Sequence, residues 1–347
     1  MQLQFRPFDL KLTHTWRIAS GRDGANLYPV VFVELRDERG RSGLGEAAPS
    51  SRYGEDVGTV QSFLARVDAG RLSFDDIAGS MRYLESLAPG HYAAKTAVNI
   101  ALVDGAARHV GQAVCDFLKL GFREGHHVTS FSIGIDRPDM IRRKTEEAAP
   151  YPVLKLKLGS ADDERNLAAL REAAPDKPVR VDANEAWKTK EEALRRIEWL
   201  HRDGRIQFVE QPMPATSDPR DLRWLKERSP LPLFGDESYH HASDLAACVD
   251  CFHGVNVKLV KAGGITGAYE ALQAARRAGL QTMIGCMIES SVLITAAAHL
   301  AELADHLDID GNLLISNDPY RGATAVNGVI SFKTAPEKTG LRVRVRE

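Results

Sequence analysis

The stretch VLKLKLG at residues 153–159 decides the fold class, because it departs from the usual pattern of a buried strand. Side chains alternate between the two faces of a strand, so the leucines share one face and Lys155 and Lys157 share the other. Strands of a parallel barrel are normally apolar on both faces. Two inward ammonium groups are costly unless they lie at the open end, near acids. Taken alone, the segment fits a surface strand with exposed lysines equally well.

Each of the next three strand-like runs ends in a carboxylate: Asp182 in VRVDAN, Glu210 in FVEQP and Asp236 in FGDES. The carboxyl ends of barrel strands meet at the mouth of the barrel, where active sites form, so we expect these acids to converge. Converging carboxylates repel one another unless a cation lies among them. An all-oxygen set without Cys or His favours Mg²⁺ over zinc. One such acid alone would more often cap a helix or lie in a loop.

The run VNVKLVKAGG supplies a further lysine, Lys258, on the sixth strand of the predicted barrel. In a ring of eight strands, the second strand lies opposite the sixth. Lys157 and Lys258 are therefore expected to face each other across the metal. Two amines in this position are typical of two bases that act on opposite faces of one carbon.

The order of the predicted elements indicates a barrel preceded by a second domain. Strands are predicted near residues 2–12, 29–37 and 42–46, and helices near 55–70, 75–88 and 91–112, which together indicate an α+β domain. After residue 128, strand-like runs alternate with helical patterns about every 25 residues, as in a parallel barrel. The runs are VTSFSIGI, VLKLKLG, PVRVDAN, IQFVEQP, LPLFGDES, GVNVKLVK, QTMIGCMIE and HLDID.

Composition excludes several classes of protein. The chain has 347 residues, 44% of them hydrophobic, and a net charge of −2, which argues against a nucleic-acid binder, since such a protein should carry a basic face. No apolar run reaches the roughly 18 residues that span a bilayer. The start MQLQFRPFDL lacks a signal-like pattern, and four cysteines fit a reducing compartment, so we expect a cytoplasmic protein. The single CVDC pair favours buried free thiols over a metal or redox site.

Together these motifs resemble the enolase superfamily, in particular the dipeptide epimerases of its muconate-lactonizing subgroup. The resemblance is carried by GLGEAAP, KLKLG, VDAN, VEQP, GDES, NVKLVKAGGI and GCMIES. It implies an α/β fold: a modified TIM barrel of the (β/α)7β type with an N-terminal α+β capping domain completed by the C-terminal tail. The boundaries expected are 1–125 for the cap and 126–324 for the barrel, and the return of 325–347 to the cap is left open.

The resemblance also implies the chemistry, which is that of an isomerase. One Mg²⁺ per subunit, held by Asp182, Glu210 and Asp236, would bind the C-terminal carboxylate of a dipeptide. Lys157 and Lys258 would invert the α-carbon by two-base 1,1-proton transfer. The enediolate formed between the two steps would be stabilised by the metal and by Lys155, as in other sites of this superfamily.

The segment HLDID distinguishes this reaction from others in the subgroup. Dipeptide epimerases carry Asp-x-Asp here, and Asp308 and Asp310 project to one side, where they would bind the free ammonium of a dipeptide. The alternatives are a strand-end turn with solvated acids, or a different enzyme, an o-succinylbenzoate synthase or another lyase or cycloisomerase, whose substrates lack an ammonium. A non-catalytic Mg²⁺-dependent binding protein would not need lysines on both sides. Further substrate contacts implied are Ser132, Cys286, Met287 and Ile288, although core packing explains a Met or an Ile equally well.

Substrate selectivity is expected to lie in two loops of the cap, residues 14–28 and 49–56. Some epimerases acting on alanyl-glutamate use an arginine in the first loop, at a position that aligns near Ala19 or Ser20, with Arg17 and Arg22 close by. Whether the enzyme prefers dipeptides with acidic, apolar or cationic side chains is therefore left open. Trp16 and Tyr53 could line an apolar pocket, and Arg17, Arg22 or Arg52 could bind an acidic group. The expected partner is a small-molecule dipeptide, with no nucleic acid or membrane, and a homo-oligomer is left open.

Overall fold

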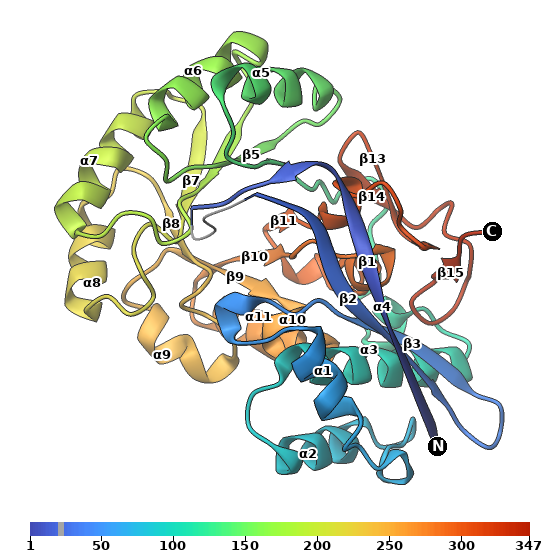
Figure 1. Ribbon diagram of the computed structural model, residues 1–347. Coiled ribbons are helices and arrows are strands. Elements are labelled where there is room, and N and C mark those ends of the chain that lie inside the picture. Colours follow the sequence, from blue (N-terminus) through green and yellow to red (C-terminus); the bar gives the residue numbers. More distant parts are fainter. Residues whose placement is uncertain (20–23) are drawn as a thin grey trace.

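The computed structural model describes residues 1–19 and 24–347, and its centre is a barrel of eight parallel strands in the order β4 to β11 (Figure 1). Between the first and last strands, Thr129 bridges to Leu307, and the backbone amide of Ser130 donates to the Leu307 carbonyl at 3.1 Å. These contacts nearly close the ring. The strands are β4 (Phe131–Ile133), β5 (Leu154–Lys157), β6 (Val179–Asp182), β7 (Ile206–Glu210), β8 (Leu233–Gly235), β9 (Gly254–Lys258), β10 (Gln281–Gly285) and β11 (His306–Asp308).

Helices connect successive strands around the outside of the barrel, as α5 to α8 show in Figure 1. They are α5 (Pro138–Glu147), α6 (Asp163–Ala173), α7 (Lys190–His201), α8 (Pro219–Arg228), α9 (Leu245–Cys248), α10 (Leu259–Ala262), α11 (Ile265–Arg277) and α12 (Ser291–Ala298). Local sequence sets their ends. The side chain of Thr189 accepts from the Glu192 amide at the start of α7, and Gly279, at φ 78°, follows the end of α11.

The N-terminal part is a three-stranded antiparallel sheet backed by helices. Its elements are β1 (Gln2–Trp16), β2 (Ala25–Arg36), β3 (Ser42–Ala47), α1 (Val57–Leu64), α2 (Ile77–Leu87), α3 (Tyr92–His109) and α4 (Val114–Phe117). Helix α3 packs tightly on β3, since a Cβ on Gly45 would lie 1.9 Å from the Ala97 carbonyl oxygen. On the barrel side, the Thr96 hydroxyl of α3 donates to the Leu259 carbonyl at 3.0 Å. Because α3 is covered on both sides, all of its residues 93–107 are buried, polar ones included.

A second link between the cap and the barrel runs through Glu46 on β3. Its buried carboxylate accepts hydrogen bonds from the amide and hydroxyl of Ser290, at 2.8 and 2.6 Å, and from the amide of Leu293, at 3.1 Å. Ser290 is the N-cap of α12, so a residue of the cap satisfies free amides at the start of a barrel helix. Burial raises the pKa of Glu46 to about 7.

The C-terminal tail lies against the cap helices. The amide of Leu341 donates to the Asp104 carboxylate of α3 at 2.7 Å, and that of Val114 donates to the Gly340 carbonyl at 3.0 Å. The predicted fold class, a modified TIM barrel with an α+β cap, is confirmed. The boundaries at residues 125 and 324 stay a prediction. The tail strands are β12 (Tyr320–Arg321), β13 (Thr324–Val326), β14 (Val329–Ser331) and β15 (Arg344–Val345).

Short 3-10 turns complete the secondary structure: η1 (Ser51–Tyr53), η2 (Ala69–Arg71), η3 (Ala242–Asp244), η4 (Ala301–Leu303) and η5 (Gly311–Leu313). Cys248 and Cys251 of the CVDC pair are buried free thiols, as expected. Within the described ranges, no helix combines the length and hydropathy needed to cross a bilayer.

Candidate active site

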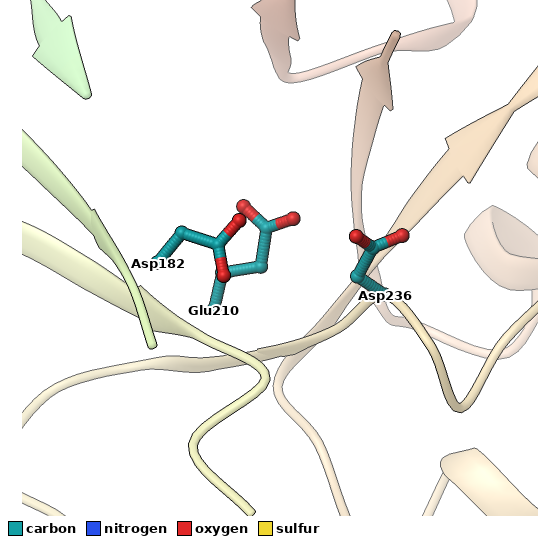
Figure 2. A group of neighbouring side chains, drawn as sticks. All are labelled: Asp182, Glu210 and Asp236. Carbon is teal, nitrogen blue, oxygen red and sulfur yellow. The ribbon is translucent and has the colours of Figure 1, made fainter. Parts of the chain in front are cut away.

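Three buried carboxylates converge at the mouth of the barrel. Asp182 ends β6, Glu210 ends β7 and Asp236 directly follows β8. One oxygen from each lies within 4.8 Å of the others, and Figure 2 shows the three carboxylates turned toward a common centre. The structure thus brings together the acids that the strand ends predicted.

Neighbouring groups hydrogen-bond the carboxylates of Asp182 and Glu210 and the backbone of Asp236. The backbone amide of Asn184 donates to Asp182 Oδ1 at 2.8 Å, Asn256 Nδ2 donates to Glu210 Oε1 at 2.7 Å, and Gln211 Oε1 accepts from the Asp236 amide at 2.8 Å. Asn184 and Gln211 have backbone φ angles of 42° and 34°, which residues other than glycine rarely adopt. The sequence analysis missed these supporting residues, although Asn184 and Gln211 stand within two residues of a predicted ligand.

The three acids fit a hard divalent cation. All donors are carboxylate oxygens, the ligand type that Mg²⁺ prefers. Glu210 Oε2 is buried and lies 2.6 Å from Lys155 Nζ, an ion pair without hydrogen-bond geometry. Burial, with the charge of Asp182, raises the pKa of Glu210 to about 7. A divalent cation at the centre would stabilise the ionised form of Glu210 and take the place that the lysine amines now hold beside the three carboxylates.

Lys157 and Lys258 flank this cluster from opposite strands. Strands β6 to β8 separate β5 from β9 on one side of the ring, and β10, β11 and β4 separate them on the other. The Nζ of Lys157 lies 2.6 Å from Asp182 Oδ2, and the Nζ of Lys258 lies 2.7 Å from Asp236 Oδ2. Burial favours the neutral amine of Lys258, but the charge of Asp236 outweighs it and holds the pKa of Lys258 well above its ordinary value.

Lys155 lies deeper, among acids. Its Nζ is 2.5 Å from Asp308 Oδ2, 2.6 Å from Glu210 Oε2 and 3.5 Å from Asp182 Oδ2. Burial opposes its charge, but the three carboxylates outweigh burial and raise the pKa of Lys155 well above its ordinary value. Lys155 therefore stays a cation.

Asp308 and Asp310 are both buried but have different partners. Besides Lys155, Asp308 accepts from the Ser130 hydroxyl at 2.7 Å, and although burial opposes ionisation, Lys155 holds its pKa at about 2. Asp310 accepts from the Ser132 amide at 2.6 Å, and burial, with the charge of Asp308, raises its pKa to about 7. Asp308 therefore forms an ion pair with Lys155, whereas Asp310 has no cationic partner among the described residues.

The other predicted contact residues divide into two groups. The Cys286 thiol lies 3.9 Å from Asp310 Oδ1, so Ser132, Cys286 and Asp310 come together. Met287 donates its amide to Glu289, and Ile288 is buried in the hydrophobic core.

Lys261 is a site residue that the sequence analysis left outside the site. Its Nζ contacts Asp236 Oδ1 and the Asp236 carbonyl, both at 2.5 Å, and the Tyr239 carbonyl at 3.0 Å. The one-turn helix α10 turns this side chain back toward the end of β8. The signal was its spacing, three residues after Lys258, which matches one helical turn.

The two cap loops reach the barrel mouth. Arg52 binds both oxygens of Glu185 through Nε and Nη2, at 2.8 and 2.9 Å, so its guanidinium is engaged by the barrel. The ring of Tyr53 meets His240 edge to face at 5.1 Å. In the first loop, the Arg17 carbonyl accepts from the Ile135 amide at 2.9 Å. Ser20 and Arg22, the other candidates in this loop, lie outside the described residues.

Comparison with known families and relatives agrees with this geometry. The enolase C-terminal domain-like family model matches residues 139–347. The chain is 65% identical to an L-Ala-D/L-amino acid epimerase of Pedosphaera parvula, over 100% of both chains. It is 39% identical to an L-Ala-D/L-Glu epimerase of Bacteroides thetaiotaomicron, over 97% of this chain and 86% of the relative.

Solved structures show the same architecture. A substrate-liganded L-Ala-D/L-Glu epimerase from Bacillus subtilis superposes with a TM-score of 0.90 at 26% identity, covering 98% of this chain and 97% of that one. A dipeptide epimerase from Enterococcus faecalis, in complex with Mg and L-Leu-L-Tyr, gives a TM-score of 0.89 at 29% identity, covering 99% and 98%. On the family match and the two relatives, this chain belongs to the enolase superfamily and, within it, to the dipeptide epimerases.

Proposed function

We propose that this protein is an isomerase that inverts the α-carbon of the C-terminal residue of a dipeptide. The observation that carries the proposal is the pair Lys157 and Lys258, which stand on opposite strands and contact opposite members of a three-acid cluster. The names of the relatives, which are epimerases of L-Ala dipeptides, support the same reaction.

Asp182, Glu210 and Asp236 would hold one Mg²⁺ per subunit. When bound, the ion supplies positive charge beside the substrate carboxylate and so stabilises the enediolate that forms when the α-proton leaves. The donor set, whose carboxylate oxygens lie within 4.8 Å of one another, supports this assignment. The related Enterococcus faecalis epimerase was solved with Mg.

The two lysines act as base and acid on opposite faces of the α-carbon. One amine removes the proton, and the opposite ammonium returns one to the other face. An ordinary lysine, with a pKa near 10.4, is mostly protonated at neutral pH, and a divalent ion held by the three acids would disfavour the charged amine beside it and so favour the neutral form that a base requires. Lys155, held as a cation by Asp308 and Glu210, stabilises the negative charge on the substrate carboxylate oxygens.

Asp310, assisted by Asp308 and Ser132, binds the free ammonium of the dipeptide. A buried carboxylate without a cationic partner among the described residues gains most from a substrate cation. The substrate of an o-succinylbenzoate synthase carries no ammonium, so it would leave Asp310 without a partner. That alternative is not favoured.

A dipeptide library in D₂O with Mg²⁺ tests the proposal. Mass spectrometry reads deuterium at the α-carbon, and NMR identifies the inverted diastereomer. We expect exchange and inversion at the second residue only. Turnover of the cyclohexadiene precursor of o-succinylbenzoate, without exchange in any dipeptide, would overturn the assignment.

A further inference from the structure

A cavity of about 250 Å³ lies between the end of β1 and the first barrel strand, β4. In Figure 1, β1 passes across the barrel on this side. The cavity lies outside the acid cluster, and none of the roles above uses it. Its apolar walls are formed by Leu12, Trp16, Phe131, Tyr151, Leu313 and Leu314.

One wall of this cavity is shared with the ammonium site. Ser132 lines the cavity, while its amide donates to Asp310 Oδ2 at 2.6 Å and its hydroxyl lies 3.4 Å from Asp310 Oδ1. On the same wall, the indole of Trp16 covers Gly134, because a Cβ on that glycine would lie 3.1 Å from the ring. Leu313 and Leu314, which also line the cavity, follow Asp310 closely in the sequence, so Ser132 and this segment link the cavity to the Asp310 carboxylate.

The charged groups around the cavity already have partners. His14 Nε2 lies 2.6 Å from Glu147 Oε2, and Lys144 Nζ lies 2.9 Å from Asp136 Oδ2. A charged ligand group would have to compete with these pairs. The aliphatic and aromatic walls favour an apolar occupant instead.

We propose that this cavity receives the side chain of the N-terminal residue of the dipeptide, and that it selects an apolar side chain larger than a methyl group. The inference rests on the proposed function, because it takes Asp310 as the partner of the substrate ammonium. The ammonium and the side chain are bonded to the same carbon, so an ammonium at Asp310 brings the side chain to the Ser132 wall. An alanine methyl would leave most of the cavity empty.

A substrate series on the wild-type enzyme provides the first test. Ala-X dipeptides first identify the second residue X that exchanges fastest. With X fixed at that residue, the first residue is then varied through Ala, Leu, Met, Lys and Asp. One methylene in an apolar pocket changes kcat/KM by roughly 10–200-fold. We expect Leu-first or Met-first dipeptides to match or exceed the Ala-first one, and Lys-first and Asp-first dipeptides to be at least tenfold poorer than Leu-first.

A matched pair of variants provides the second test. Leu12 and Lys11 are neighbours on β1, but Leu12 lines the cavity whereas Lys11 is exposed. Leu12→Trp should lower the Leu-first to Ala-first ratio of kcat/KM at least tenfold, and Lys11→Trp should leave that ratio unchanged.

The outcomes separate this inference from the proposed function. If Ala-first dipeptides exchange deuterium rapidly and Leu-first and Met-first dipeptides exchange it slower by a factor of 100 or more, the inference is overturned but the proposed function is not. An equal change of the ratio in both variants would do the same. Absence of exchange with every dipeptide would overturn the proposed function and the inference with it.

Discussion

Lys261 and Asp236 form a buried ion pair in which the lysine contacts both the side-chain Oδ1 and the backbone carbonyl, each at 2.5 Å. The other oxygen of Asp236 is taken by Lys258 at 2.7 Å. Asp236 is therefore held by two lysines, and one of them, Lys261, has no proposed role in the proton transfers.

Replacing Lys261 with methionine should therefore destabilise the protein. The change leaves a buried carboxylate and three carbonyl oxygens without this donor, and breaking a buried pair in this way costs about 3–5 kcal/mol. Urea denaturation measures the loss in the free energy of unfolding. Lys333→Met, at an exposed position, is the control, and equal stability of the two variants would show that the buried ion pair contributes nothing.

Lys157→Arg and Lys258→Arg should each abolish epimerisation. Arginine keeps the positive charge but does not deprotonate near neutral pH, so it cannot serve as the base. Single-isomer dipeptides in D₂O, followed by NMR, check this prediction. The two variants should lose exchange from opposite stereoisomers, and retained inversion in either would rule out a two-base reaction.

Removal of divalent ions should abolish turnover, and Mg²⁺ should restore it. A ligand that binds only the folded state raises the melting temperature, so Mg²⁺ should also raise the Tm of the EDTA-treated wild type. Asp182→Asn and Glu210→Gln should lose that rise in Tm. If Mg²⁺ raised the Tm of these variants as much as that of the wild type, the metal would have to bind elsewhere.

Asp310→Asn should lower kcat/KM by about 100-fold for dipeptides with a free ammonium, since a buried hydrogen-bonded charge pair is worth roughly 2–5 kcal/mol. N-acetyl dipeptides should be poor substrates for the wild type. Equal turnover of free and acetylated dipeptides by the wild type would contradict the assignment. Asp308→Asn is a less selective change, because it also removes a partner of Lys155.

Acid should weaken the fold through His299. Burial lowers the pKa of His299 to about 3, and the ring accepts from the Cys115 amide at 3.2 Å and stacks on Phe332 at 4.5 Å. Between pH 6.5 and about 3, the unfolded chain binds a proton that the native ring does not, so the free energy of unfolding falls as pH falls, by up to about 1.4 kcal/mol per pH unit.

The His299→Gln variant isolates that contribution. Its free energy of unfolding, measured in urea from pH 7.5 to 5, should depend less steeply on pH than that of the wild type. If the free energy of unfolding fell equally steeply with pH in the wild type and in the variant, groups other than His299 would account for the loss of stability in acid.

Much of the barrel and its metal cluster could be predicted because period and spacing are local signals. Alternation in VLKLKLG put Lys155 and Lys157 on one face, and the strand ends put three acids at one mouth. The supporting contacts could not be read in this way. Asn256 reaches Glu210 across 46 residues of sequence, and Arg52 reaches Glu185 across 133, so only the folded chain shows them.

Selectivity for the side chains was the least predictable part. Arg52 was a candidate for binding an acidic group; the structure pairs it with Glu185, and its role toward a substrate stays a prediction. The cavity beside Ser132 depends on β1 of the cap meeting β4 of the barrel, residues more than a hundred positions apart. Such a meeting leaves no periodic signal in either segment.

The carboxylate of Glu46, which receives the first amides of α12, ties the two halves of the chain into one cooperative unit. A barrel excised without β3 would expose the first amides of α12 to water, and a cap expressed alone would expose the Glu46 carboxylate, so neither half keeps this contact. Limited proteolysis should therefore yield no stable half-molecule, and any other cap would have to bring its own acceptor to the start of α12.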